Sequence, residues 1–157
     1  MQKRAWIKKK DRASGVEKAI LKWFRENIDP LAERAEEGCK EYDILCKTVG
    51  NVEVKEDRIA HGTKNYAIEF KDAEGEPSGI ETTTAEQFVI VDWENVLMIP
   101  TSVLKDIIKN CKEKRVVEMG YRTLKGRQAM GWLIPCERLL NNPNVVSYKR
   151  WFPVEND

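Results

Sequence analysis

The sequence contains a single histidine, His61. Zinc sites that use two or three histidines are therefore excluded, as are nuclease motifs that depend on a pair of histidines. A hydrolase of the Ser-His-Asp or Cys-His type would have to use His61, and no nucleophile-elbow motif of the form Gly-x-Ser-x-Gly is present. If the protein is an enzyme, its chemistry must come from Asp, Glu, Lys or Tyr side chains.

The sequence also lacks closely spaced cysteines and long apolar runs. No Cys-x-x-Cys pair occurs among its four cysteines, which are Cys39, Cys46, Cys111 and Cys136. The N-terminus is charged and has no apolar segment typical of a signal peptide, and no apolar run approaches the length that crosses a bilayer. We therefore expect reduced thiols, no membrane partner and an intracellular location, which is the host cytoplasm if the protein is viral.

Positive and negative charges nearly cancel, with 27 basic and 26 acidic residues. The net charge therefore gives no indication of a nucleic-acid partner. Two segments are nevertheless locally basic, residues 1–13 and residues 121–127, and either can follow a phosphate backbone. The plainer interpretations are a solvated terminus and an exposed hairpin tip. The side chains expected to bind DNA are Lys8, Lys9, Lys10, Arg122, Lys125 and Arg127.

Apolar spacing and turn residues predict one α+β domain over residues 14–150, between a basic arm (residues 1–13) and a tail (residues 151–157). A capping box predicts a first helix from Ser14, and Asp29-Pro30 predicts a second, short helix up to residue 37. A further helix capped by Thr101 and a helical turn at residues 136–140 are expected. Strands of a mixed sheet flanked by these helices are expected at residues 42–49, 52–56, 66–71, 88–91, 96–99, 115–119 and 129–134.

The candidate catalytic group is Asp43 followed by Glu53 and Lys55. Residues 53 and 55 of a strand point to the same face, so a carboxylate and an ammonium group stand side by side. Carboxylates bind hard divalent cations, so Mg²⁺ or Mn²⁺ is the expected cofactor. Such a cation polarises a phosphate and lowers the pKa of its bound water, while a lysine stabilises the developing negative charge. This combination is suited to phosphodiester hydrolysis.

The turn between the two strands decides whether Asp43 belongs to this group. A tight two-residue hairpin at Gly50-Asn51 places Asp43 on the opposite face of the sheet from Glu53. A wider loop, centred on Thr48, places Asp43 directly opposite Glu53. Gly-Asn is not the favoured Asn-Gly order, and the sequence leaves both geometries open.

Glu86 is a further candidate for the metal site. Thr83 to Glu86 has the spacing of a capping box, and a helix beginning there directs free backbone amides at a phosphate. Glu86 can then hold the metal or activate water, or it can be only a cap. If the hairpin is tight, we expect the acidic cluster around Glu86 and Glu69; otherwise Glu69 is a solvent-facing strand residue. His61 is expected in a loop near the substrate.

Asp43, ten residues, then Glu53-x-Lys55 resembles the Asp…Glu-x-Lys signature of the PD-(D/E)XK nuclease superfamily, and Glu17 is placed like the helical glutamate of many members. Over roughly residues 40–140, further segments resemble small phage and viral nuclease-like proteins of that superfamily. They are Lys55-Glu56-Asp57-Arg58, Ala60-His61, Thr63-Lys64-Asn65, Ile68-Glu69, Pro77-Ser78-Gly79-Ile80, Thr83-Thr84-Ala85-Glu86, Ile99-Pro100-Thr101 and Gly131-Trp132-Leu133-Ile134-Pro135. Two positions depart from the pattern: Tyr42 replaces a proline, and Lys64 replaces a glycine.

The resemblance implies a deoxyribonuclease that hydrolyses phosphodiester bonds of double-stranded DNA with Mg²⁺ or Mn²⁺. Asp43, Glu53 and Glu86 are the metal ligands that it implies, and Lys55 completes the catalytic group. The chain is also similar in length and style to a small nuclease of archaeal filamentous viruses, which implies an α+β fold nearer to a nucleotidyltransferase topology. No Gly-Ser followed by Asp-x-Asp is present, so a working nucleotidyltransferase is not expected. The alternative is a non-catalytic viral DNA-binding protein with a nuclease-like fold, and the oligomeric state stays open.

Overall fold

The first helix is longer than the capping box predicts. The computed structural model describes residues 2–154, with side chains from residue 13 onward, and helix α1 spans Gln2–Asn27. The expected start at Ser14 is wrong because residues 2–14 contain no proline or glycine that would end a helix. The Ser14 hydroxyl accepts a hydrogen bond from Arg34 Nη2 at 3.0 Å instead of acting as a cap.

A six-stranded mixed sheet forms the centre of the fold. Its strands, in spatial order, are β1 (Glu33–Arg34), β2 (Ile44–Leu45), β3 (Val52–Glu56), β5 (Gln87–Val91), β6 (Asn95–Pro100) and β9 (Val146–Lys149). Only β3 and β5 run parallel, while all other neighbours are antiparallel. The expected single α+β domain with a mixed sheet and helices is therefore confirmed.

A second, smaller sheet was not expected. It contains β4 (Asn65–Lys71), β8 (Ala129–Pro135) and β7 (Arg115–Met119), all antiparallel. β4 lies in the connection between the parallel strands β3 and β5, together with the short helix α2 (Ala60–Thr63) and the 3₁₀ turn η1 (Gly79–Glu81). The chain thus leaves the large sheet, adds one strand to the small sheet and returns.

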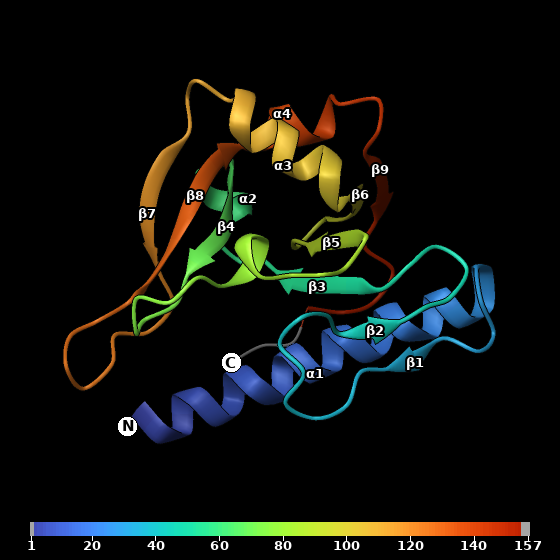
Figure 1. The fold of residues 1–157 in the computed structure, drawn as a ribbon, viewed down its shortest axis with the longest axis horizontal. Coiled ribbons are helices and arrows are strands. Elements are labelled where there is room, and N and C mark those ends of the chain that lie inside the picture. The colour runs from blue at the N-terminus through green and yellow to red at the C-terminus, as the bar shows by residue number, and fades with distance from the viewer. Residues whose placement is uncertain (1, 155–157) are drawn as a thin grey trace.

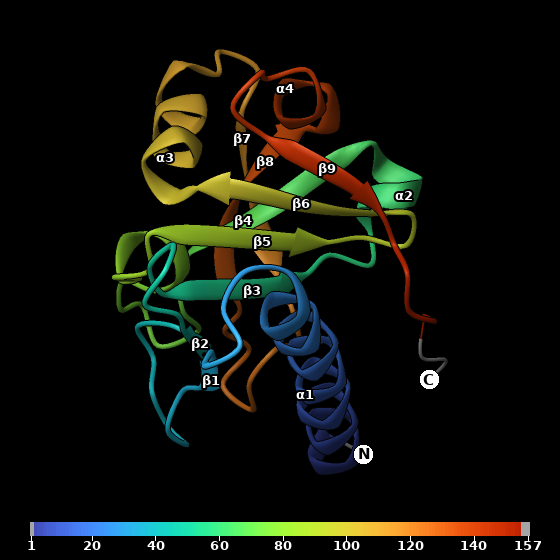
Figure 2. The same cartoon turned by 90° about the vertical axis from the view of Figure 1, so that its right-hand side faces the viewer.

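Helix α1 covers one face of the large sheet, and the small sheet together with two further helices covers the opposite face (Figures 1 and 2). On one face, Ile20 and Phe24 of α1 pack against Val52, Val89 and Val91. On the other face, β4, β8, α3 (Thr101–Asn110) and α4 (Cys136–Leu140) pack against Phe88, Ile90, Leu97 and Ile99. Successive apolar residues of β5 therefore point to opposite faces of the sheet and pack into two different hydrophobic cores. No helix in the described part of the chain is long and apolar enough to cross a membrane.

The second helix expected at residues 29–37 is wrong. Asp29 instead closes a turn, because its Oδ1 accepts the N–H of Leu31 at 2.9 Å and its carbonyl accepts the N–H of Ala32 at 3.0 Å. Arg25 Nε donates to the Ala32 carbonyl at 2.7 Å, which holds this turn against α1. The chain then becomes β1, so Asp29-Pro30 begins a turn rather than a helix.

The helix start expected at residues 83–86 is also wrong. The segment has no regular secondary structure and bends at Glu86, with the Thr83 hydroxyl donating to the Glu41 carbonyl at 2.7 Å and accepting the N–H of Ala85 at 3.1 Å. Thr101 does begin α3, but its side chain makes no cap hydrogen bond. Thr83 and Glu86 therefore have the spacing of a capping box, but their side chains bind distant residues and no helix begins between them.

Left-handed backbone occurs at Lys64, with φ of 59°. This is the position at which the family pattern has a glycine, and the left-handed region favours glycine because it has no Cβ. Lys64 ends α2, and its own N–H binds the Ala60 carbonyl. At Lys64 a residue with a Cβ therefore adopts the left-handed conformation that ends α2.

Gly79 has φ of +54°, and a Cβ built there would lie 2.2 Å from the Glu69 carbonyl oxygen. We expect Gly79→Ala to lower the free energy of unfolding by about 1–3 kcal/mol, because it adds backbone strain and displaces η1 from β4. Gly62→Ala is the control: its Cβ would meet nothing within 4 Å, and its φ is not left-handed. Urea denaturation of both variants tests this, and equal stability would contradict it.

Candidate active site

The register of β2 and β3 brings Asp43 close enough to Glu53 for its charge to raise the pKa of Glu53. Ile44 pairs with Val52, so the connecting loop is centred on Thr48, as in the wider of the two expected geometries. Gly50-Asn51 does not form a tight hairpin, because the Asn51 N–H donates to Glu86 Oε2 at 2.7 Å. The wide loop is thus held by a carboxylate from the segment before β5.

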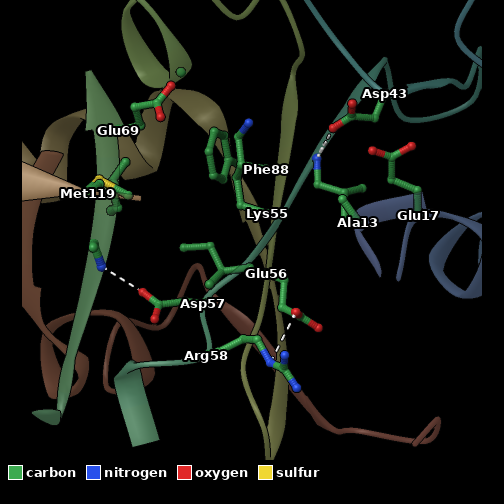
Figure 3. A pocket seen from close by; sticks show the side chains of 15 residues that line it. Ala13, Glu17, Asp43, Lys55, Glu56, Asp57, Arg58, Glu69, Phe88 and Met119 are labelled. Atoms are coloured by element: carbon green, nitrogen blue, oxygen red, sulfur yellow. Dashed lines mark hydrogen bonds and ion pairs between the residues drawn. The ribbon is translucent and has the colours of Figure 1, made fainter. Parts of the chain in front are cut away.

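Asp43 directly precedes β2 in the chain. Beside Asp43, the outer edge of β3 no longer has a neighbouring strand. Its N–H donates to the Val52 carbonyl at 2.8 Å, and its Oδ2 accepts the N–H of Val54 at 2.7 Å. The carboxylate therefore replaces a strand at this edge. Glu17 of α1 points toward Asp43 (Figure 3) and is held by Arg34 Nη2 at 3.0 Å.

Glu53 and Lys55 project from β3 on the face that also carries Phe88 and Ile90, their register partners on β5. Lys55 Nζ lies 3.0 Å from Glu53 Oε1. The side chain of Glu53 is 7% exposed and that of Lys55 is 47% exposed. Glu53 is thus a buried carboxylate whose ammonium partner reaches solvent.

Lys55 borders a cavity of about 260 Å³, whereas Glu53 is not among the residues that line it. The lining comes from α1, β3, β4, η1, β5 and β7, and its charged side chains include Glu17, Asp43, Lys55 and Glu69. In Figure 3, Lys55 lies between Glu69 on one side and the pair of Asp43 and Glu17 on the other. Three carboxylates from three different elements therefore surround one lysine.

Burial raises the pKa of Glu53 to about 7, although Lys55 opposes this shift, and the nearby charges of Asp43 and Glu17 add to it. Burial also raises the pKa of Asp43, against the hydrogen bond from Val54 and the charge of Lys55. The pKa of Glu17 is raised by burial and by Asp43. Burial lowers the pKa of Lys55, but Glu53, Asp43 and Glu69 outweigh it, so the net shift is upward. Excess negative charge is thus concentrated at this site.

The donor set suits a hard cation chemically, because it consists of carboxylate oxygens. In the arrangement of residues 13–154, however, no three His, Cys, Asp or Glu side chains converge closely enough to hold a metal ion. Glu86 is not among the residues that line the cavity. Its carboxylate binds the N–H of Asn51, and its carbonyl accepts the N–H of Thr101 at 2.9 Å.

Two buried aspartates that the sequence did not single out have structural partners. Asp57 Oδ1 accepts the N–H groups of Ile59 and Ala60, and Oδ2 accepts that of Ala67 at 2.8 Å. Asp92 Oδ2 accepts the Tyr66 hydroxyl at 2.5 Å. Burial raises the pKa of Asp57 and of Tyr66. The role of Asp57 could have been recognised in the sequence from its position, because it lies three residues before Ala60, the buried residue that begins α2.

The residues expected to contact DNA lie at one end of the molecule. Arg122, Lys125 and Arg127 belong to the loop joining β7 and β8, which lies beside the N-terminal half of α1 in both views (Figures 1 and 2). Arg122 pairs with Glu118 at 2.8 Å, and Arg127 pairs with Glu74 at 3.5 Å. Lys8, Lys9 and Lys10 belong to α1, but their side chains lie outside the described residues.

His61 lies in α2 rather than in a loop. Its Nδ1 is 3.1 Å from Glu94 Oε1, and its ring stacks on Trp93 with 5.7 Å between centroids. It is exposed, and it is not among the residues that line the cavity around Lys55. Its expected place near a substrate stays a prediction.

Comparison with known proteins identifies no relative: no protein-family model and no curated protein matches the chain. The geometry of the site therefore carries the functional argument.

The raised pKa of Glu53 predicts that stability depends on pH. Between the ordinary value of 4.5 and about 7 the folded protein retains a proton that the unfolded chain releases, so the free energy of unfolding falls as pH rises through this window. We expect Glu53→Gln to lose less stability than the wild type between about pH 5 and about pH 8. Urea denaturation with a chelator present measures this, and parallel losses in both proteins would contradict it.

Proposed function

We propose that the protein is a metal-dependent nuclease that hydrolyses phosphodiester bonds of double-stranded DNA. The observation that carries the proposal is the placement of Asp43 at the edge of β3, where its charge acts on Glu53, with Lys55 Nζ 3.0 Å from Glu53 Oε1 and a cavity beside Asp43 and Lys55. A helix carrying Glu17 precedes a hairpin carrying Asp43 and Glu53-x-Lys55, which is the order of parts in the PD-(D/E)XK resemblance. That order supports assignment to this superfamily.

Each side chain has a role that follows from its position. Asp43 and Glu53, with Glu17 behind Asp43, would hold Mg²⁺ or Mn²⁺, which supplies an activated water and polarises the phosphate when bound. Burial raises both pKa values, and the charge of Asp43 adds to the shift of Glu53; a bound divalent cation would favour the ionised form of both carboxyl groups. Lys55 is charged at neutral pH and its side chain reaches solvent, so it can stabilise negative charge on the phosphate. Glu69 also lines the cavity, where its charge helps to raise the pKa of Lys55 and its Oε2 accepts the Ser78 hydroxyl at 2.8 Å.

The surroundings of the cavity suit a polyanion. The N-terminal half of α1, in which the sequence places six basic residues between positions 3 and 12, lies on one side. The loop with Arg122, Lys125 and Arg127 lies beside it (Figures 1 and 2). A duplex lying across this basic end could place its backbone over Lys55, with phosphate contacts from both segments fixing its position.

A second candidate function is DNA binding without catalysis. It is favoured by the absence of three converging metal-ligand side chains among residues 13–154 and by the pairing of Lys55 with Glu53. Both functions predict salt-dependent DNA binding. Only the nuclease predicts that conservative changes at Asp43, Glu53 and Lys55 abolish cleavage while leaving binding intact.

Cleavage of linear and circular duplex DNA tests the nuclease directly. We expect cutting with Mg²⁺ or Mn²⁺ and none with a chelator. Glu53→Gln, Asp43→Asn and Lys55→Met should each lower the rate by at least about a hundredfold, since each removes a charge that acts on the reacting phosphate. Lys105→Met, which changes an exposed lysine of α3, is the matched control and should cut normally.

Glu86→Gln distinguishes the role expected from the sequence, a ligand of the metal, from the role seen in the structure, a hydrogen bond to Asn51 in the β2–β3 loop. A normal rate would assign Glu86 to holding the β2–β3 loop, whereas a loss equal to that of Glu53→Gln would return it to the catalytic group. Folded variants of Asp43, Glu53 and Lys55 that all retain wild-type cleavage would refute the proposal.

Metal binding is expected to stabilise the folded protein. At about pH 8 the carboxylates are ionised, so Mg²⁺ at about a hundred times its Kd should add about 2.7 kcal/mol to the free energy of unfolding and raise Tm. Glu53→Gln and Asp43→Asn should lose this increase, and Glu86→Gln should keep it. Thermal unfolding with and without Mg²⁺ measures the effect, and an unchanged wild-type Tm would point to the non-catalytic alternative.

A further inference from the structure

A larger groove adjoins the candidate active site. Its volume is about 790 Å³, and it lies between the turn joining β5 and β6, the segment before α2, and β7. The two cavities share lining residues, among them Arg58, Ala67 and Met119. A strand whose phosphate lies at Lys55 can therefore continue into this groove without leaving the surface.

Exposed aromatic and apolar side chains distinguish the groove from the active-site cavity. Trp93 is 46% exposed, Tyr121 is 58% exposed and Ile59 is 69% exposed, and all three line the groove. Large exposed rings next to a candidate phosphodiester site are typical of surfaces on which unpaired bases stack. A base pair within a duplex cannot use such a surface, because its faces are already stacked on its neighbours.

Trp93 is held firmly enough to act as a stacking platform. It occupies a turn in which Asp92 Oδ1 accepts the N–H groups of Glu94 and Asn95 at 2.7 and 2.6 Å. The buried Arg150 side chain donates to the Asp92 carbonyl at 3.0 Å, and His61 stacks on the indole. The ring therefore loses little further freedom when a base binds.

The charge of the groove favours a neutral base over a phosphate. Its lining includes Glu56, Asp57 and Glu118, and among the lining side chains of residues 13–154 Arg58 is the only basic one. Acidic side chains repel phosphate oxygens, so the sugar–phosphate backbone would stay at the rim near Lys55 while the base enters. A volume of about 790 Å³ lies within the range of small-ligand sites.

We propose that the groove lined by Trp93 and Tyr121 binds an unpaired nucleobase of a DNA strand whose phosphate lies at Lys55. This inference rests on the proposed function and specifies its substrate: DNA with an unpaired nucleotide beside the scissile bond, such as an overhang or a frayed end. A fully paired blunt duplex then contacts only the active-site cavity and the basic loop.

Fluorescence anisotropy tests the inference with two labelled probes, a single-stranded oligodeoxythymidylate of about twelve nucleotides and a blunt hairpin duplex. Trp93→Ala and Tyr121→Ala should weaken binding of the single strand about five- to a hundredfold, the range expected for loss of one stacked base, and leave duplex binding unchanged. Trp93→Phe should restore most of the affinity because it keeps an aromatic face. Trp151→Ala is the matched control: Trp151 is 42% exposed and does not line the groove.

The outcomes for the groove and for the nuclease are distinguishable. Unchanged single-strand binding in both alanine variants, equal loss on both probes, or no single-strand binding by the wild type would overturn the groove. Cleavage of blunt and overhanging DNA by the wild type reports on the nuclease, whatever the variants do. If the wild type cuts neither but Trp93→Ala selectively weakens single-strand binding, the groove stands and the nuclease fails.

Discussion

The hydrogen bond from the Val54 N–H to the Asp43 carboxylate is the contact on which the site depends. β2 pairs with β3 through one residue pair only, and beyond it the edge of β3 would present unpaired backbone groups. The carboxylate takes the place of the missing strand and is thereby fixed beside Glu53 and Lys55. Because a side chain rather than a strand covers this edge, room is left for the cavity into which Glu17 and Glu69 project.

This arrangement brings the carboxylates of Asp43 and Glu17 close to that of Glu53, and their negative charges repel it. Glu53 is almost completely buried, and its single ammonium partner does not compensate for desolvation and two neighbouring carboxylates, since its pKa is still raised. By contrast, Asp57 accepts three backbone N–H groups and Asp92 accepts a tyrosine hydroxyl. Asp57 and Asp92 thus accept hydrogen bonds from neighbouring donors, whereas Glu53 has one ammonium partner and two nearby carboxylates. Incompletely compensated charge is more common at functional sites than in structural networks.

The sequence predicted most strands and the side-by-side placement of Glu53 and Lys55, because these follow from apolar spacing and from the Glu-x-Lys alternation on one strand. Strands β4, β5, β6, β7 and β8 all lie where their spacing indicated. The predictions from the sequence failed where a residue with a local helix-capping pattern instead contacts a distant part of the chain. Glu86 binds Asn51, 35 residues away, and Asp29 closes a turn against α1. Strands β1 and β9 were missed because they have only two and four residues, too few for a clear period-two pattern. The position of Asp43 relative to Glu53 depends on the loop between β2 and β3, which Glu86 holds through Asn51. No local sequence pattern indicates that contact.

The route of the chain between β3 and β5 has a consequence for folding. The two parallel strands can pair only after the intervening segment has been placed, and that segment contributes β4 to a sheet whose other strands come from residues 115–135. Neither sheet is therefore made of contiguous chain, and loops must close over long sequence distances before either is complete. The two sheets form one cooperative unit, so folding is expected to be slow for a chain of this size, and removing β7 and β8 would leave β4 without a partner rather than yield a smaller stable domain.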